Sequence, residues 1–476
     1  MTQKQRQSAA TASPAKRAKP ATDPALKPVS SKSAIPLEDF RKMIPRSVAA
    51  QKRTDKYISG GSTRGRVPPN DHPVYIDHGE GCYVYDLDGH RYIDFINSSF
   101  ALPLGHNWPT IREAIKEQVE NGTFFTAATE TEAQLAELLC KRIPSFERMR
   151  FSCSGTEATM FALRGARAYT GKRKIAKMKG GFHGTSDYFS TSIGIMSSGV
   201  PDDGTYDATK TAALGIPPDI LEDVILLSFN NRKFTEQQIE KHKNELAAVF
   251  VEPVMGAAGM IPPKDNYLQF LRDITKRYNI LLVFDEMISM GIAAGGAQEH
   301  YGVTPDMTCC GKVIGGGMPI GAIGGSEAVM EVFDSRKRTP YVNHGGTFAG
   351  HPLSMVAGIA QQTSCTPAVY KKLHKQGEYL RGKINELFEA TKAPMTVVGV
   401  GQLFCFHATG DEVINFETAQ KGDGMRVWKI LDSMTRQGIH QVKTSRGSTS
   451  YPMEQEHLDA YVKAMEVALW ETGTIK

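Results

Sequence analysis

The sequence predicts an α/β fold with a mostly parallel central sheet, and two observations lead to this prediction. From about residue 150 to residue 312, short apolar runs alternate with stretches of helical periodicity, and runs such as Ala247–Val251 are continuously apolar. Continuous apolar strands are typical of a sheet that helices cover on both faces. Short alternating strands in residues 73–95 come first and indicate a smaller antiparallel unit.

The predicted elements follow one another along the chain. An antiparallel meander is expected at Val74–Ile76, Cys82–Asp86 and Arg91–Phe95, with turns at Gly79–Gly81 and Asp88–Gly89. The central strands are expected at Arg150–Ser152, Lys174–Ala176, Val224–Leu227, Ala247–Val251, Ile280–Phe284 and Met307–Cys310. Helices are expected through Arg167 and from Leu268 to Tyr278.

Composition and pattern divide the chain into four parts. Residues 1–35 are rich in Ala, Ser, Pro and Lys, and we expect disorder there because such a segment cannot offset the entropy of ordering. Residues 36–105 and 346–476 are expected to form one smaller α+β domain from both ends of the chain. Residues 106–345 are expected to form the large domain. The basic cluster Lys16–Lys19 is either an address signal or part of a solvated tail.

The overall composition excludes several classes of protein. The net charge of +5 over 476 residues comes largely from the N-terminal tail, which argues against a nucleic-acid-binding surface. No stretch of about 18 apolar residues predicts a membrane span, and no signal-peptide pattern is present. The seven scattered cysteines lack metal-ligand spacing. We therefore expect a cytoplasmic protein that binds neither nucleic acid, membrane nor metal.

The segment Ser154–Glu157 lies where a predicted strand passes into a helix. Backbone N–H groups at a helix N-terminus favour an anion, and the Ser and Thr hydroxyls add donors. The segment is therefore a candidate phosphate site, although Ser and Thr are also ordinary helix caps.

Two charged residues follow predicted strands. Asp285 ends a continuous apolar strand, where open α/β sheets bind ligands, and a buried carboxylate needs a partner such as a pyridinium nitrogen. Lys312 follows the strand Met307–Cys310 and precedes Gly315–Gly317. Burial lowers the pKa of a lysine, which can then act as nucleophile and base. Taken singly, Asp285 could instead be an aspartate that ends a strand in a turn, and Lys312 could be a solvated surface lysine.

In this order, the motifs resemble those of the class III (fold-type I) aminotransferases that depend on pyridoxal 5'-phosphate. The resemblance extends from about residue 55 to residue 470. It implies the fold-type I architecture, pyridoxal phosphate as cofactor, and a homodimer with shared active sites. The motifs that carry it are Ser154–Ala158, Gly180–Gly184, Val251–Pro253, Phe284–Glu286, Gly311-Lys312 with the following glycines, and Gly346–Phe348.

The resemblance implies a role for each matching residue. Lys312 would hold the cofactor as a Schiff base, and Asp285 would pair with its pyridine nitrogen. His183 would either support the site or be structural. Ser154, Gly155 and Thr156 would bind the phosphate, and Thr347 would reach the phosphate of the neighbouring subunit. Phe182 would lie on the face of the ring, with Glu252 nearby. Met287 stands where the family commonly has Val.

Within the class, the resemblance is strongest to β-amino-acid aminotransferases of the β-phenylalanine type, and then to glutamate-1-semialdehyde aminomutases. Arg64 and Arg446 match loop arginines that bind substrate carboxylates, for which the planar guanidinium is suited. The expected reaction is ping-pong transfer of an amino group, with a β-amino acid as the favoured donor and a keto acid as acceptor. The alternatives are an aminomutase or racemase with the same cofactor, or a catalytically silent cofactor-binding regulator.

Overall fold

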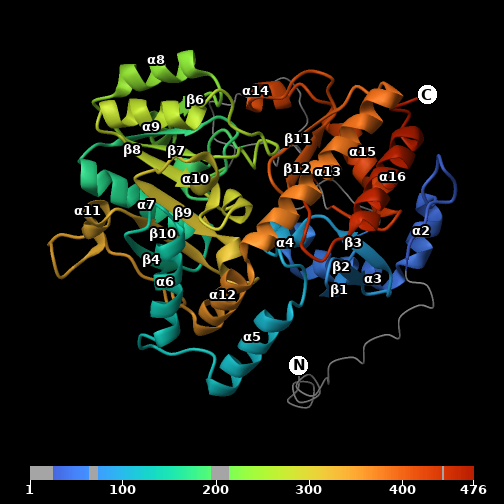
Figure 1. The fold of residues 1–476 in the computed structure, drawn as a ribbon, viewed down its shortest axis with the longest axis horizontal. Helices are drawn as coiled ribbons and strands as arrows, with labels where there is room; N and C mark the ends of the chain where they lie inside the picture. The colour runs from blue at the N-terminus through green and yellow to red at the C-terminus, as the bar shows by residue number, and fades with distance from the viewer. Residues whose placement is uncertain (1–24, 64–72, 194–213, 442–443) are drawn as a thin grey trace.

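A seven-stranded sheet dominates the computed structural model, which describes residues 25–63, 73–193, 214–441 and 444–476 (Figure 1). Its strand order is β4-β10-β9-β8-β7-β5-β6. The five strands from β9 to β6 are mutually parallel, and β10 runs antiparallel to both of its neighbours. The strands are β4 (Arg148–Ser152), β5 (Lys174–Met178), β6 (Val224–Leu227), β7 (Leu246–Val251), β8 (Leu281–Asp285), β9 (Met307–Gly311) and β10 (Gly321–Gly325). The predicted mostly parallel α/β sheet is confirmed.

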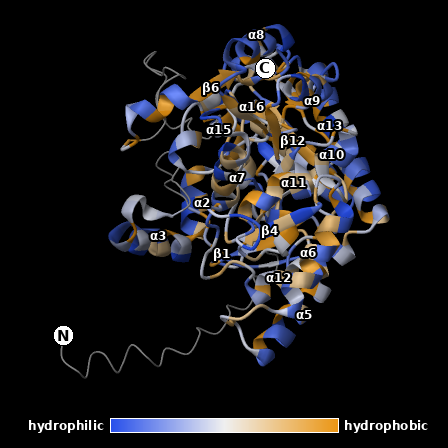
Figure 2. Ribbon diagram, turned by 90° about the vertical axis from the view of Figure 1, so that its left-hand side faces the viewer, coloured by the Kyte–Doolittle hydropathy of each residue, from blue (hydrophilic) through white to orange (hydrophobic). Residues whose placement is uncertain are grey.

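Helices on both faces explain why the central strands are apolar throughout. Val249 and Val251 of β7 join the core cluster that contains residues of α8 and α9, whereas Ala248 and Phe250 join the cluster built on α7. Alternate residues therefore bury against opposite helical layers. Figure 2 shows the result, with β6 hydrophobic and the outer helix α8 largely hydrophilic. The helices around this sheet are α5 (Pro109–Asn121), α6 (Glu130–Arg142), α7 (Gly155–Thr170), α8 (Arg232–His242), α9 (Tyr267–Arg277), α10 (Gly296–Tyr301), α11 (Glu327–Met330) and α12 (Pro352–Ser364).

Two smaller sheets are present, and the four-stranded one combines strands from both ends of the chain. The predicted antiparallel meander is confirmed, and it gains a fourth strand because β13 pairs in parallel with β3. Figure 1 shows these N-terminal strands beside the C-terminal helices. The four-stranded sheet holds β1 (Ile76–Glu80), β2 (Tyr83–Asp86), β3 (Arg91–Asp94) and β13 (Ile439–His440), and the three-stranded sheet holds β11 (Thr396–Val398), β12 (Leu403–His407) and β14 (Arg446–Ser448).

The remaining helices surround these two sheets or precede them. A core cluster containing Phe404, Phe406 and Tyr461 joins β12 to the long C-terminal helices. The boundaries at residues 105 and 345 that we expected between the domains stay a prediction. These helices are α2 (Leu37–Met43), α3 (Pro45–Tyr57), α4 (Asn97–Phe100), α13 (Pro367–Thr391), α14 (Phe416–Ala419), α15 (Gly424–Thr435) and α16 (Gln455–Glu471).

The structure corrects two expectations at the N-terminal end. Residues 1–24 lie outside the described range, but residues 25–35, for which we predicted disorder, have a defined path. Leu26 and Ala34 are buried there, Leu26 in a cluster with Phe40 and Tyr92, so this segment gains apolar contacts that its composition did not suggest. Strand β1 begins two residues later than expected and continues through Gly79 to Glu80. None of its side chains is buried, so the strand has no apolar pattern from which its bounds could be predicted.

Two searches of the described residues gave negative results. No helix there is both long enough and apolar enough to cross a membrane. No group of three or more His, Cys, Asp and Glu side chains in the same residues is arranged to hold a metal ion.

Candidate active site

The carboxyl ends of three neighbouring strands bring the predicted residues together. Asp285 is the last residue of β8, and Lys312 directly follows β9. These strands are parallel, with Asp285 opposite Cys309, so both residues lie at the same edge of the sheet. Glu252 directly follows β7, the next strand along. This edge is where open α/β sheets bind their ligands.

Asp285 is a buried carboxylate held by two donors. Its exposure is 2%, its Oδ2 lies 2.8 Å from Nδ1 of the fully buried His183, and its Oδ1 accepts from the backbone N–H of Met287 at 3.1 Å. Both contacts fix the direction of the carboxylate. Nε2 of His183 is buried and has no hydrogen-bond partner among the described residues.

Lys312 has the properties expected of a nucleophilic lysine. Burial lowers its pKa to about 8, although the negative charges of Asp285 and Glu252 act in the opposite direction. About a tenth of the amine is therefore neutral at pH 7 and about half of it at pH 8. Its φ of 49° is left-handed, which costs a residue with a side chain about 1–2 kcal/mol. The glycines on either side, at 311 and 315–317, allow the tight turn.

The predicted phosphate site lies at the start of helix α7. Ser154 is the N-cap and accepts from the backbone N–H of Glu157 at 3.2 Å, while the Glu157 carboxylate accepts from Cys153 N–H at 2.8 Å. Ser154 therefore is the ordinary helix cap that we left open as an alternative. The cap does not preclude an anion site, because the first N–H groups of a helix have no partner within it.

Met287 fills the space between the phosphate loop and the segment before Lys312. A Cβ atom at Gly155 would lie 2.7 Å from its Sδ, and a Cβ atom at Gly311 would lie 2.9 Å from it. The two glycines thus make room for methionine where the family commonly has the smaller valine. Methionine is well suited to an irregular gap of this kind.

Phe182 lies on the loop of residues 179–193 and is unusually exposed for its type. Its relative exposure is 37%, whereas its neighbours Gly181 and His183 are buried. Its backbone N–H donates to Glu252 Oε1 at 2.9 Å, and Glu252 Oε2 accepts from Ala257 N–H at 3.1 Å. Burial raises the pKa of Glu252. The carboxyl group of Glu252 therefore anchors the backbone at the exposed ring.

Arg446 is a buried arginine without an acidic partner. Its exposure is 8%, and among the described residues its guanidinium donates to the carbonyl of Gly256 and the hydroxyl of Thr444, both at 3.3 Å. No carboxylate among the described residues lies within ion-pair distance of it. Its charge lowers the pKa of Lys312. Arg64, the other predicted substrate residue, lies outside the described residues.

Thr347 is placed away from the core. It is exposed, as is Phe348, whose ring lies 5.1 Å from that of Phe124 and is 55% exposed. The role of Thr347 in a partner's site stays a prediction.

One residue of the site region was missed in the sequence. Lys177 lies in the middle of β5, is fully buried, and contacts the loop that carries Phe182. The signal was present, because a lysine inside the apolar run Ile175–Met178 is unusual.

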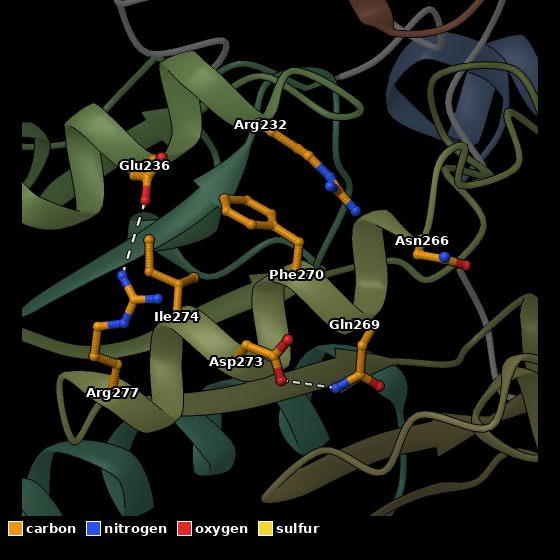
Figure 3. A pocket seen from close by; sticks show the side chains of 8 residues that line it. All are labelled: Arg232, Glu236, Asn266, Gln269, Phe270, Asp273, Ile274 and Arg277. Atoms are coloured by element: carbon orange, nitrogen blue, oxygen red, sulfur yellow. Dashed lines mark hydrogen bonds and ion pairs between the residues drawn. The ribbon is translucent and has the colours of Figure 1, made fainter.

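A shallow hollow elsewhere on the surface contains none of the predicted site residues (Figure 3). It lies on α8 and α9, and four of its polar side chains interact in two pairs. Arg277 lies 3.9 Å from Glu236, and Gln269 donates to Asp273 at 2.8 Å. The edge of the sheet therefore remains the candidate site.

A family profile described as aminotransferase class-III matches residues 66–469. The chain belongs to the class-III aminotransferase family. It is 37% identical to glutamate-1-semialdehyde 2,1-aminomutase 2 of Lachnoclostridium phytofermentans, a match that covers 82% of this chain and 90% of that protein. This confirms the predicted family and its cofactor, pyridoxal 5'-phosphate.

Two solved structures support the same assignment. An omega-transaminase from Sphaerobacter thermophilus is 38% identical, with a TM-score of 0.84 over 90% of this chain and 98% of that one. A β-phenylalanine aminotransferase from Variovorax paradoxus is 33% identical, with a TM-score of 0.80 over 92% and 96%. The predicted fold-type I architecture of this class-III aminotransferase is confirmed.

The residues of this aminotransferase fit the cofactor. A fully buried carboxylate with its direction fixed suits a pyridinium nitrogen, and the exposed ring of Phe182 suits a planar ligand. The start of α7 offers N–H groups to a phosphate. The lowered pKa of Lys312 suits a lysine that binds a carbonyl carbon.

Proposed function

We propose that this aminotransferase transfers the amino group of a β-amino acid, or of an amino acid with similar spacing, to a keto acid. The observation that carries the proposal is Arg446, a buried guanidinium that lowers the pKa of Lys312 and has no carboxylate partner among the described residues. A buried charge without a partner is costly, and a substrate carboxylate would supply that partner. The β-phenylalanine aminotransferase among the similar structures supports this substrate class.

In the proposed site each residue has a defined task. Pyridoxal phosphate, when bound, supplies an electron sink for the substrate carbon that carries the amine. Asp285 keeps the pyridine nitrogen protonated, with His183 and Met287 N–H holding its two oxygens. Lys312 holds the cofactor and moves the proton at the reacting carbon, which its pKa of about 8 permits near neutral pH.

The remaining cofactor-binding residues position the cofactor and take no part in the reaction. Ser154, Gly155 and Thr156 bind the phosphate at the start of α7. Phe182 stacks on the ring, Glu252 holds the backbone N–H of Phe182, and Met287 packs on the other side of the site. Arg64 binds a second substrate carboxylate in this proposal, so that donor and acceptor can each be held by an arginine.

We also propose a homodimer in which Thr347 completes the phosphate site of the partner subunit. The exposed ring of Phe348 and the half-buried ring of Phe124, which lies against it, support a contact surface at this position. Large exposed aromatic groups that cluster are typical of protein interfaces.

The test is the substrate dependence of Arg446→Ala. Removing one charge-assisted contact should cost about 1.5–3 kcal/mol, so kcat/KM for a β-amino acid should fall roughly ten- to a hundredfold. A matched amine that lacks the carboxylate should be far less affected, because it never makes the contact. Equal losses on both substrates would show that Arg446 is structural. The same pair of assays on Arg64→Ala tests the second carboxylate site.

The aminomutase relative makes isomerisation a second candidate. An isomerase moves the amino group within one molecule and therefore needs no separate acceptor. Incubating the purified protein with donors in the presence and absence of a keto acid separates the two reactions. Product that forms only with the acceptor supports amino transfer, whereas acceptor-independent conversion of glutamate-1-semialdehyde supports the isomerase.

A further inference from the structure

Lys177 is a fully buried lysine whose partners are backbone carbonyl groups. It lies in β5, in register with Leu226 of β6 and Phe250 of β7, and its exposure is 0%. No carboxylate among the described residues lies within ion-pair distance of its Nζ. Burial lowers its pKa to about 7, and the nearby charge of Glu252 opposes this. A side chain in this position needs other groups to stabilise its ammonium.

Those groups all come from the loop of residues 179–193. Nζ donates to Thr191 O at 2.6 Å and to Gly181 O at 2.8 Å. It also lies 3.4 Å from Phe189 O and 3.5 Å from Ser192 O. One ammonium group therefore ties the beginning of the loop to its end. Three N–H donors shared among four carbonyl oxygens fix the relative position of these segments.

The loop has a second, weaker tie at the same place. The backbone N–H of Gly180 donates to Ser192 O at 2.9 Å. Ser192 has a φ of 44°, in the left-handed region that residues with side chains rarely adopt. Such a backbone conformation is stable only where neighbouring groups hold it in place. Nζ of Lys177 is one of the groups that contact Ser192.

The segment between the tied ends carries the residues that face the cofactor. Phe182 and His183 follow Gly181 directly, and His183 contacts Asp285 at 2.8 Å. Glu252 holds the same stretch from the other side through Phe182 N–H. The loop thus lies between a buried ammonium from β5 and a buried carboxyl group after β7, which do not pair directly with each other.

We propose that Lys177 is a positioning residue for the cofactor, whose ammonium fixes the loop of residues 179–193 so that Phe182 and His183 face the pyridine ring. The inference rests on the proposed roles of Phe182 and His183 but is independent of the substrate. An apolar side chain at this position would avoid the cost of a buried charge. It would also leave the two ends of the loop without their common donor.

The test compares Lys177→Met with Lys174→Met as a matched control. Lys174 lies on the same strand but pairs with Glu245 at 2.9 Å, away from the loop. Lys177→Met should weaken pyridoxal phosphate binding roughly ten- to a hundredfold and change the visible circular dichroism of the bound cofactor. It should also narrow the difference in Tm between the enzyme with cofactor and the enzyme without it. Lys174→Met should leave all three measurements unchanged.

Two further results decide the interpretation. If Lys177→Met lowers both Tm values equally and leaves the cofactor affinity unchanged, Lys177 is only structural and the inference is wrong. If the wild-type protein itself binds no pyridoxal phosphate, the proposed function fails instead.

Should Lys177→Met not fold, Lys177→Ala in ammonium chloride replaces it, because the ammonium ion can occupy the space between the carbonyl groups. Recovery of cofactor binding with ammonium but not with sodium supports the inference, and equal behaviour in both salts contradicts it.

Discussion

Arg446 is buried and Lys312 is half-buried, and the charge of Arg446 affects the charge state of Lys312. Burial is the main cause that lowers the pKa of Lys312 to about 8, and the charge of Arg446 lowers it further. A substrate carboxylate bound to Arg446 would neutralise that charge. The pKa of Lys312 would then rise, so that the lysine becomes a stronger base when the substrate is in place.

This arrangement predicts how cofactor uptake depends on pH. Lysine reacts only as the neutral amine, and because the pKa of Lys312 is lowered from 10.5 to about 8, the neutral fraction grows as the pH rises through about 8. The rate at which the cofactor-free enzyme gains visible absorption with added pyridoxal phosphate should follow that curve over about pH 6 to 10. In Arg446→Gln the midpoint should move upward, because a repelling charge is gone. A midpoint near 10.5 in the wild type would mean that Lys312 is not buried as described.

Sequence motifs indicated Asp285 and Lys312 as candidate site residues but not the groups that hold them in place. The contact between His183 and Asp285 joins residues 102 positions apart, and no local pattern encodes it. Lys177 was missed because a lysine next to an apolar run looks like the end of a strand. Only the structure shows that the strand continues to Met178 and buries the charge.

At the level of elements, strand β10 lies in close contact with the backbone of the proposed phosphate site. A Cβ atom at Gly321 would lie 2.1 Å from the carbonyl oxygen of Ser154 and 2.5 Å from Oγ of Ser152. Backbone atoms cannot move aside as the end of a flexible side chain can. Only glycine therefore lets β10 lie this close to the N-cap of α7.

We expect Gly321→Ala to lower the Tm and to weaken pyridoxal phosphate binding, because the added methyl group pushes the phosphate loop out of place. Overpacking of this kind typically costs roughly 1–3 kcal/mol. Gly382→Ala is the control, since this glycine is exposed in helix α13 and a Cβ atom there would meet nothing within 4 Å. It should stabilise the protein by up to about 1 kcal/mol and leave cofactor affinity unchanged. Unaltered cofactor binding in Gly321→Ala would contradict the proposed position of the phosphate.

How well each strand could be predicted follows from its surroundings. Strand β6 was predicted residue for residue because its four apolar side chains stand out between polar segments. Strand β10 was missed, since its sequence Gly-Ala-Ile-Gly-Gly has neither alternation nor bulk. The three-stranded sheet of β11, β12 and β14 was missed as well. Its shortest members have only three residues, and the pairing of β12 with β14 joins residues 41 to 45 positions apart.

The proposed dimer concerns the whole molecule. Phe124, Phe348 and His351 form a group of rings, with centroids 5.1 to 5.9 Å apart, and Thr347 is next to it in the chain. An aromatic group of this size that is partly open to solvent is expected to be covered in a stable assembly. We expect a dimer in sedimentation velocity at assay concentrations.

A mixed dimer tests whether the sites are shared. Lys312→Ala subunits should lack transamination, and Thr347→Trp subunits should bind the cofactor poorly. If Thr347 serves the partner's site, a dimer with one subunit of each kind has one site with both defects and one intact site. Activity should then recover to about half of the wild type, because one of two sites works. If Thr347 acts within its own subunit, no site in the mixed dimer is intact and no activity should return.

The pairing of β3 with β13 has a consequence for synthesis of the chain on the ribosome. Ile93 forms its ladder with Ile439, so the partner of this N-terminal strand is translated about 350 residues later. At roughly 5–20 residues per second, the edge of β3 waits roughly 20–70 s for its partner. During that time the meander exposes an unpaired strand edge, the kind of surface that invites aggregation. The nascent chain is therefore most vulnerable long before the seven-stranded sheet is complete, and binding of a chaperone to the first hundred residues would protect it.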